Sequence, residues 1–230
     1  NAGVFLVQAF GEDAFDPELV SDSLDMMGIV KVSKTAPRFI FADEYIAGLG
    51  TVPEERQRLE SLRLQEKLLP ASEGLWGGGG GTGEIRDLAD FIESNGKAID
   101  AIVAAADKPR YYVPLITIDD PPRLISASLA IERRLAFISR VLTAGALQRA
   151  AEGDFSAALK EFAACHKLAY LLATGSPLDV SIAKAHVVDA IACRGEVALI
   201  ESGKLTAEAA KPFQETLAAL PPLPTCDQAA

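Results

Sequence analysis

The chain has few positive charges, few histidines and no long apolar run, and these absences argue against several classes of function. Its 22 lysines and arginines are outnumbered by 32 acidic residues, which gives a formal net charge of -10. Nonspecific nucleic-acid binding requires clustered cations that displace phosphate counterions, so this balance argues against a nucleic-acid partner. No segment approaches the roughly eighteen apolar residues that cross a bilayer, and we therefore expect no membrane-spanning helix.

Cysteine is also scarce. Cys165, Cys193 and Cys226 are odd in number and lack the spacing of a metal knuckle or a redox motif. Cys165 and Cys193 are interpreted as small apolar fillers of helices, whereas Cys226 is expected to be exposed in the tail and able to pair between chains. The chain begins at Asn1 without a methionine, which is typical of a processed protein, so an exported or envelope-associated bacterial protein is one localisation left open.

What the chain does have is apolar residues, 49% of 230, enough for a sizeable core in one elongated domain or two small ones. Its predicted organisation is a helical and irregular N-terminal region (1–76), a glycine-rich linker (77–83), a helical-hairpin domain (84–220) and a proline-rich tail (221–230). Periodicity and breaker residues predict helices near residues 1–10, 17–28, 53–69, 84–108, 121–152, 154–174, 178–202 and 206–220. The run Phe39-Ile40-Phe41 fits either a buried strand or apolar anchors in a loop.

The most informative stretch begins at Gly153. This glycine can adopt the left-handed conformation that closes a helix, and Asp154 or Ser156 can cap the next helix. An apolar series at helical spacing then runs to position 172. The segment 201–209 repeats the order of residue types around Gly203, so a diverged repeat and a coincidental helix boundary both remain open.

Eight residues carry a resemblance in this region: Leu142, Ala146, Gly153, Phe155, Ala158, Phe162, Cys165 and Leu168. They resemble one unit of the tetratricopeptide family, with Ala146 where that family often has glycine and Cys165 where it often has alanine. The large aromatic residue early in the first helix is missing, and Tyr170 stands near the place of the helix-ending proline. The C-terminal half is also similar to uncharacterised bacterial envelope proteins through its RYYVPL, EGD and LPP segments. The tetratricopeptide resemblance implies an all-α array of antiparallel hairpins, a tetratricopeptide-like α-solenoid with an irregular N-terminal portion. The similarity to the envelope proteins indicates a class of protein and does not indicate an activity.

Both histidines lie in the predicted hairpin of helices 154–174 and 178–202. If these helices are antiparallel, His166 and His186 lie at the same level along the hairpin. Four polar residues share one stripe of the second helix: His186, Asp189, Cys193 and Glu196. Imidazoles and a carboxylate suit zinc, so a metal-binding protein or metal-dependent hydrolase using His166, His186 and Asp189 is the alternative hypothesis. The same stripe also fits the solvated side of a helix.

The sequence contains no set of residues with the spacing of a known kind of catalytic site, so an enzyme is the less favoured hypothesis. We expect a noncatalytic binding or scaffolding module that holds a peptide or protein partner in a groove between helices, lined by Tyr111, Tyr112 and Tyr170. The sequence indicates no cofactor, and no motif in it encodes the oligomeric state.

Overall fold

The computed structural model describes residues 1–15, 17–29, 32, 37–48, 82–117, 119–121, 129–176 and 178–225. Every regular element among these residues is a helix, which confirms the all-α prediction. The N-terminal elements are α1 (Ala2–Phe10), two 3₁₀ turns (Gly11–Ala14 and Pro17–Leu19), α2 (Val20–Met26) and α3 (Ala42–Gly48). The remaining helices are α6 (Thr82–Ser94), α7 (Gly96–Ala106), α8 (Ala130–Ala151), α9 (Phe155–Gly175), α10 (Asp179–Glu201) and α11 (Ala207–Ala218).

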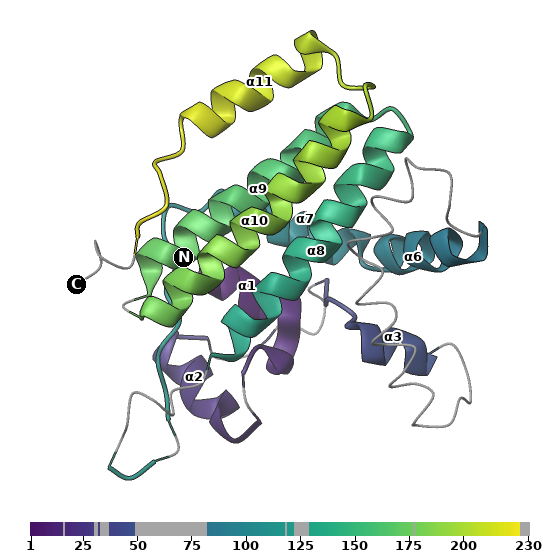
Figure 1. The fold of residues 1–230 in the computed structure, drawn as a ribbon. Helices are drawn as coiled ribbons and strands as arrows, with labels where there is room; N and C mark the ends of the chain where they lie inside the picture. Colours follow the sequence, from purple (N-terminus) through teal and green to yellow (C-terminus); the bar gives the residue numbers. More distant parts are fainter. Residues whose placement is uncertain are drawn as a thin grey trace.

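Three long helices, α8, α9 and α10, form a bundle in which each packs against the other two (Figure 1). Helices α7 and α11 pack on α9, and α1 packs on α7. One cluster of buried apolar side chains extends from α1 through α7 into the bundle, so the first helix shares its core with the hairpin helices. Helix α10 approaches its neighbours closely at Gly195, where a Cβ atom would overlap the Thr143 and Phe162 side chains.

The two glycine corners are confirmed. Gly153 has φ 91°, and Asp154 caps α9 by accepting a hydrogen bond from the Ala157 amide at 3.0 Å. Gly203 has φ 67°, and Thr206 caps α11 by accepting from the Ala209 amide at 3.3 Å. Helices α9, α10 and α11 therefore begin within a residue of their predicted starts.

The single helix predicted over 84–108 is wrong, because the chain breaks at Asn95 between α6 and α7. The Asn95 side chain is buried. Its oxygen accepts from the Ile40 amide at 2.7 Å, and its nitrogen donates to the Ile40 carbonyl at 3.1 Å. This contact holds the segment 37–41 against the helices, and Phe39 is fully buried there. The Phe39-Ile40-Phe41 run thus supplies apolar anchors in a loop and no strand.

Helix α8 begins at Ala130, later than the predicted start at Pro121, and residues 122–128 lie outside the described residues. The helix predicted over 53–69, most of the 77–83 linker and Cys226 also lie outside them, whereas Thr82 and Gly83 open α6. Within the described ranges, none of the helices is long and apolar enough to cross a bilayer.

Candidate functional site

A cluster of polar side chains inside the bundle surrounds His166 of α9. Its Nδ1 atom lies 2.6 Å from Asp189 Oδ1, and its Nε2 atom lies 2.6 Å from Glu196 Oε1. Asp189 and Glu196 are seven residues apart on α10, a spacing that places them on one stripe facing α9. The His166 side chain is 8% exposed, against 33% for Asp189 and 16% for Glu196. Two carboxylates therefore hold a buried imidazole by both of its ring nitrogens.

The two carboxylates determine the charge of this imidazole. Burial lowers the pKa of His166, but the hydrogen bonds and charges of Glu196 and Asp189 raise it further, and the net pKa lies above the usual value. Each ring nitrogen also lies 2.6 Å from a carboxylate oxygen, and both can donate only if both carry a proton, so this arrangement favours the imidazolium form of His166. An imidazolium has no lone pair with which to accept a proton, so His166 in this state is not a general base.

Cys193 completes the cluster on α10. Its Sγ atom lies 3.9 Å from Asp189 Oδ2, and one ligand atom each of His166, Asp189 and Cys193 lie within 4.8 Å of one another. Burial, followed by the charges of Asp189 and Glu196, raises the pKa of the Cys193 thiol. Cys165 is fully buried, and burial raises the pKa of its thiol as well. Neither described cysteine is thus an activated nucleophile at neutral pH.

The sequence-based grouping of His166 with Asp189 matches this arrangement, but His186 lies elsewhere. The exposed His186 ring places Nε2 3.1 Å from the Pro224 carbonyl oxygen, in the segment that follows α11. The hairpin argument located His186 along the helix axis but not around it. Each residue turns a helix by about 100°, so His186 is rotated by about 60° from Asp189. Glu196 was in the predicted stripe, and its seven-residue spacing from Asp189 was the signal that both acids face one neighbour.

A second buried titratable group lies on the opposite side of α9. Glu161 Oε1 lies 2.7 Å from Arg149 Nε of α8, and the Glu161 side chain is 6% exposed. Its other oxygen, Oε2, has no hydrogen-bond partner among the described residues. This oxygen lies close to Gly145, where a Cβ atom would be 3.1 Å from it. Burial raises the pKa of Glu161 to about 7, although the charge of Arg149 opposes the rise.

The three tyrosines predicted to line a groove differ in how far their side chains are buried. Tyr111 is buried, and its hydroxyl has no partner within the described part of the chain. Its carbonyl oxygen lies against Gly175 at the end of α9, where a side chain would overlap it. Tyr112 is 48% exposed, and Tyr170 is half-buried. A groove formed by these tyrosines stays a prediction.

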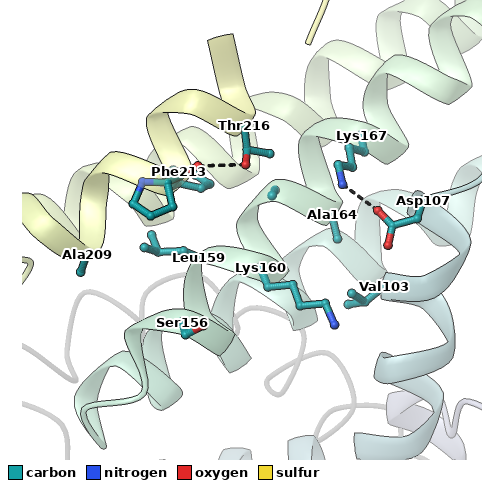
Figure 2. Close-up of a pocket in the computed structure, with 12 residues that line it drawn as sticks. Val103, Asp107, Ser156, Leu159, Lys160, Ala164, Lys167, Ala209, Phe213 and Thr216 are labelled. Carbon is teal, nitrogen blue, oxygen red and sulfur yellow. Dashed lines mark hydrogen bonds and ion pairs between the residues drawn. The ribbon is translucent and has the colours of Figure 1, made fainter. Parts of the chain in front are cut away.

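A groove of about 370 Å³ lies between α7, α9 and α11 (Figure 2). Twelve residues line it, none of them the predicted tyrosines: Val103, Asp107, Ser156, Leu159, Lys160, Ala163, Ala164, Lys167, Ala209, Pro212, Phe213 and Thr216. The four residues from α11 follow a helical spacing, and none of the residues of α11, all of them described, is buried. Helix α11 thus rests on the bundle with a hollow beneath it.

Two lysines of α9 give the groove its charge. Lys167 Nζ donates to Asp107 Oδ1 at 2.6 Å. Figure 2 shows Lys160 extending from α9 toward Val103 of α7, and no described residue bonds its ammonium group. The rest of the lining is mostly apolar, so the groove can accept an apolar group with an anion beside it.

No family model, curated protein or solved structure matches this chain. The resemblance to the tetratricopeptide family therefore stays a prediction.

Proposed function

We propose that this protein is a noncatalytic binding module that holds a peptide segment of a protein partner in the groove between α7, α9 and α11. The observation that carries this proposal is the hollow of about 370 Å³ beneath the apolar stripe of α11. Ligand sites in proteins are typically concave, mostly apolar and a few hundred Å³ or more in volume, with a small number of polar groups that orient the ligand. One or two apolar side chains of a peptide would fill this hollow.

Charge favours an acidic residue beside the apolar anchor. The chain as a whole carries a formal charge of -10, and in the groove Asp107 pairs with Lys167, which leaves the ammonium group of Lys160 unpaired among the described residues. An exposed ion pair contributes at most about 1 kcal/mol. The apolar anchor therefore supplies most of the affinity, and Lys160 selects peptides that carry an Asp or Glu nearby.

The proposal includes a tetratricopeptide-like arrangement of hairpins. The antiparallel pairs α8–α9 and α9–α10, joined by short corners, support it, because helical repeats bind extended peptides on surfaces made by stacked hairpins. Helix α11 would then close the array at its C-terminal end and supply one wall of the binding groove.

A metal-dependent hydrolase is the weaker candidate. Hydrolysis needs a base that activates water, and Asp189 and Glu196, the two carboxylates beside His166, are both engaged with its ring nitrogens. Metal binding without catalysis is a separate question, since it depends on ligand atoms and not on a free base.

The test is selection of short random peptides displayed on phage against the full chain. Ala209→Phe fills the groove from α11, and Ala218→Phe is the matched control, because Ala218 is exposed on the same helix and does not line the groove. We expect selected peptides to carry a large apolar residue close to an Asp or Glu. They should bind the parent and Ala218→Phe and lose at least about tenfold in affinity for Ala209→Phe, which corresponds to about 1.4 kcal/mol.

A charge reversal at Lys160 gives a second matched comparison. Lys160→Glu should weaken the selected peptides several-fold, whereas Lys211→Glu, on the exposed side of α11, should leave them unchanged. Peptides that bind Ala209→Phe as well as they bind the parent would overturn the proposal. So would native mass spectrometry that finds a stoichiometric small molecule retained by the parent and absent from Ala209→Phe.

A further inference from the structure

We infer that His166, Asp189 and Cys193 form a site for one divalent transition-metal ion of the zinc type, and that Glu196 is the outer partner of His166. The proposed site shares no residue with the groove, so it stands or falls independently of the peptide-binding proposal.

The three ligand atoms are already close to the required spacing. Zinc binds nitrogen and oxygen at about 2.0 Å and sulfur at about 2.3 Å, so ligand atoms around a tetrahedral ion lie about 3 to 4 Å apart. Here His166 Nδ1 lies 2.6 Å from Asp189 Oδ1, and Cys193 Sγ lies 3.9 Å from Asp189 Oδ2. Small rotations of the Asp189 and Cys193 side chains would open the first distance and admit an ion.

Glu196 gives this cluster a feature that a plain surface ion pair lacks. A histidine that binds a metal through one nitrogen usually donates its other N–H to a carboxylate or a carbonyl, which fixes the tautomer and orients the ring. His166 Nε2 lies 2.6 Å from Glu196 Oε1, so this second bond is in place. Nδ1, on the side of Asp189 and Cys193, is then the nitrogen that receives the ion.

The exchange balances in protons and charge. On binding, His166 loses the proton on Nδ1 and Cys193 loses its thiol proton, both to solvent, while the proton on Nε2 stays between His166 and Glu196. The ion then faces one carboxylate and one thiolate, whose two negative charges match its own charge. No bond other than these two, N–H and S–H, is broken.

The donor set and the exposure indicate which ions fit. Imidazole and thiolate favour zinc and cobalt over magnesium and calcium, which prefer oxygen ligands. Cys193 is exposed and borders a shallow hollow of about 300 Å³ on α10, lined by Cys193, Arg194, Val197, Ala198 and Glu201. The ion can therefore enter from solvent, and water can take the fourth position that three protein ligands leave open.

The test is a Co²⁺ titration of the full, metal-free chain, followed by absorption spectroscopy. Bound cobalt reports its ligands, because a thiolate ligand adds a charge-transfer band in the near ultraviolet. We expect one equivalent of Co²⁺ with this band, displaced by one equivalent of Zn²⁺. The band should disappear in Cys193→Ser, an exposed and nearly isosteric change that leaves both His166 contacts intact and whose fold is checked by circular dichroism.

Three matched controls separate this site from its neighbours. Cys165→Ala, His186→Ala and Cys226→Ser should each keep the thiolate band. Glu196→Gln should keep the band but weaken Zn²⁺ binding by about 10- to 100-fold, as expected for the loss of a carboxylate that orients a ligand. Asp179→Asn, at an exposed carboxylate of the same helix that does not line the hollow beside Cys193, should bind Zn²⁺ as the parent does.

Several results would overturn the inference. Failure of the parent to bind Co²⁺ or Zn²⁺ below millimolar concentration would do so, and so would cobalt that binds without a thiolate band. A band that survives Cys193→Ser, or one that is lost in His186→Ala, would assign the ion to other residues.

Discussion

Glu161 and His166 lie five residues apart on α9, and both side chains are buried, but they face different helices and meet different numbers of opposite charges. Glu161 faces α8 and has one cation, Arg149, at 2.7 Å. His166 faces α10 and has a carboxylate 2.6 Å from each ring nitrogen. For Glu161, burial outweighs the single partner and raises the pKa to about 7, toward the neutral acid. For His166, the two carboxylates outweigh burial, so its pKa is raised and the charged form is favoured.

Burial alone therefore does not determine the charge of a titratable side chain in this bundle. Desolvation disfavours the charged form of both side chains, and at Glu161 the one ion-paired partner offsets it only in part. At His166 two carboxylates outweigh burial, whereas at Glu161 the single cation does not, and the charges of Asp100 and Asp154 raise the pKa of Glu161 further. The charged form of His166 is therefore favoured in its contact with α10, whereas Glu161, in its contact with α8, changes its charge near neutrality.

We expect the largest loss in the free energy of unfolding when the His166 side chain is removed. His166→Ala removes the cation between Asp189 and Glu196 and leaves two carboxylates at the α9–α10 interface. Removing one partner of a buried ion pair typically costs 3 to 5 kcal/mol, and we expect a loss of about 4 kcal/mol in the free energy of unfolding. Urea denaturation in the presence of a chelator measures this loss without any metal contribution.

His186→Ala is the matched control, because this histidine lies on α10 with an exposed ring and one bond to the Pro224 carbonyl. We expect its cost to stay below about 0.5 kcal/mol, as is usual for surface substitutions. Equal costs for the two variants would show that the carboxylate pair does not depend on His166.

The next largest effect concerns Glu161 and the pH dependence of stability. The folded-state pKa of Glu161, about 7, lies above the ordinary value of 4.5, so between these values the unfolded chain releases a proton that the folded chain keeps. The contribution of Glu161 to the free energy of unfolding is therefore fully present below about pH 4.5 and is lost as pH rises through 7. A shift of this size corresponds to about 3 kcal/mol.

Glu161→Gln cannot titrate, so its stability relative to the parent should rise by up to about 3 kcal/mol between acidic and mildly alkaline pH. Denaturant unfolding of both proteins over this pH range gives the difference directly. Glu132 is also buried with a raised pKa, but it is present in both proteins and cancels. Glu201→Gln, at an exposed carboxylate of α10, should run parallel to the parent. A Glu161→Gln curve that also runs parallel would show that Glu161 ionises normally.

Local signals predicted much of the hairpin half. The corners at Gly153 and Gly203 are set by a glycine with positive φ and by a capping side chain that immediately precedes the next helix, all within one short window of sequence. The pairing of α9 with α10 followed from the short connection at Ser176, and it brought His166 to Asp189 as expected.

Other features depend on contacts between segments far apart in the chain. The break at Asn95 exists because its side chain pairs with the backbone of Ile40, 55 residues away, which no helical periodicity reveals. The burial of Glu161 depends on Gly145 of α8, whose missing side chain leaves room for the carboxylate. The groove needs α11 to lie over α9, and the apolar stripe of α11 does not by itself specify which helix it covers.

The substitution with the smallest predicted effect removes Arg149, the single cationic partner of Glu161. Arg149→Gln removes the cation, so the folded-state pKa of Glu161 should rise further above 7, and the loss of stability should extend to higher pH. The Arg149 side chain is 35% exposed and therefore partly screened by solvent, so we expect a cost of about 1 to 2 kcal/mol at alkaline pH. At acidic pH, where Glu161 is already protonated, the cost should fall to about 0.5 kcal/mol or less.

Unfolding of Arg149→Gln at both pH values, beside Arg194→Gln as an exposed control on α10, measures this difference. In the Glu161→Gln background the pH-dependent part of the Arg149→Gln cost should vanish, since no carboxylate remains for the arginine to stabilise. A cost that is independent of pH in both backgrounds would mean that Arg149 contributes through the packing of its aliphatic stem. The contrast between one partner at Glu161 and two at His166 would then no longer explain their different charges.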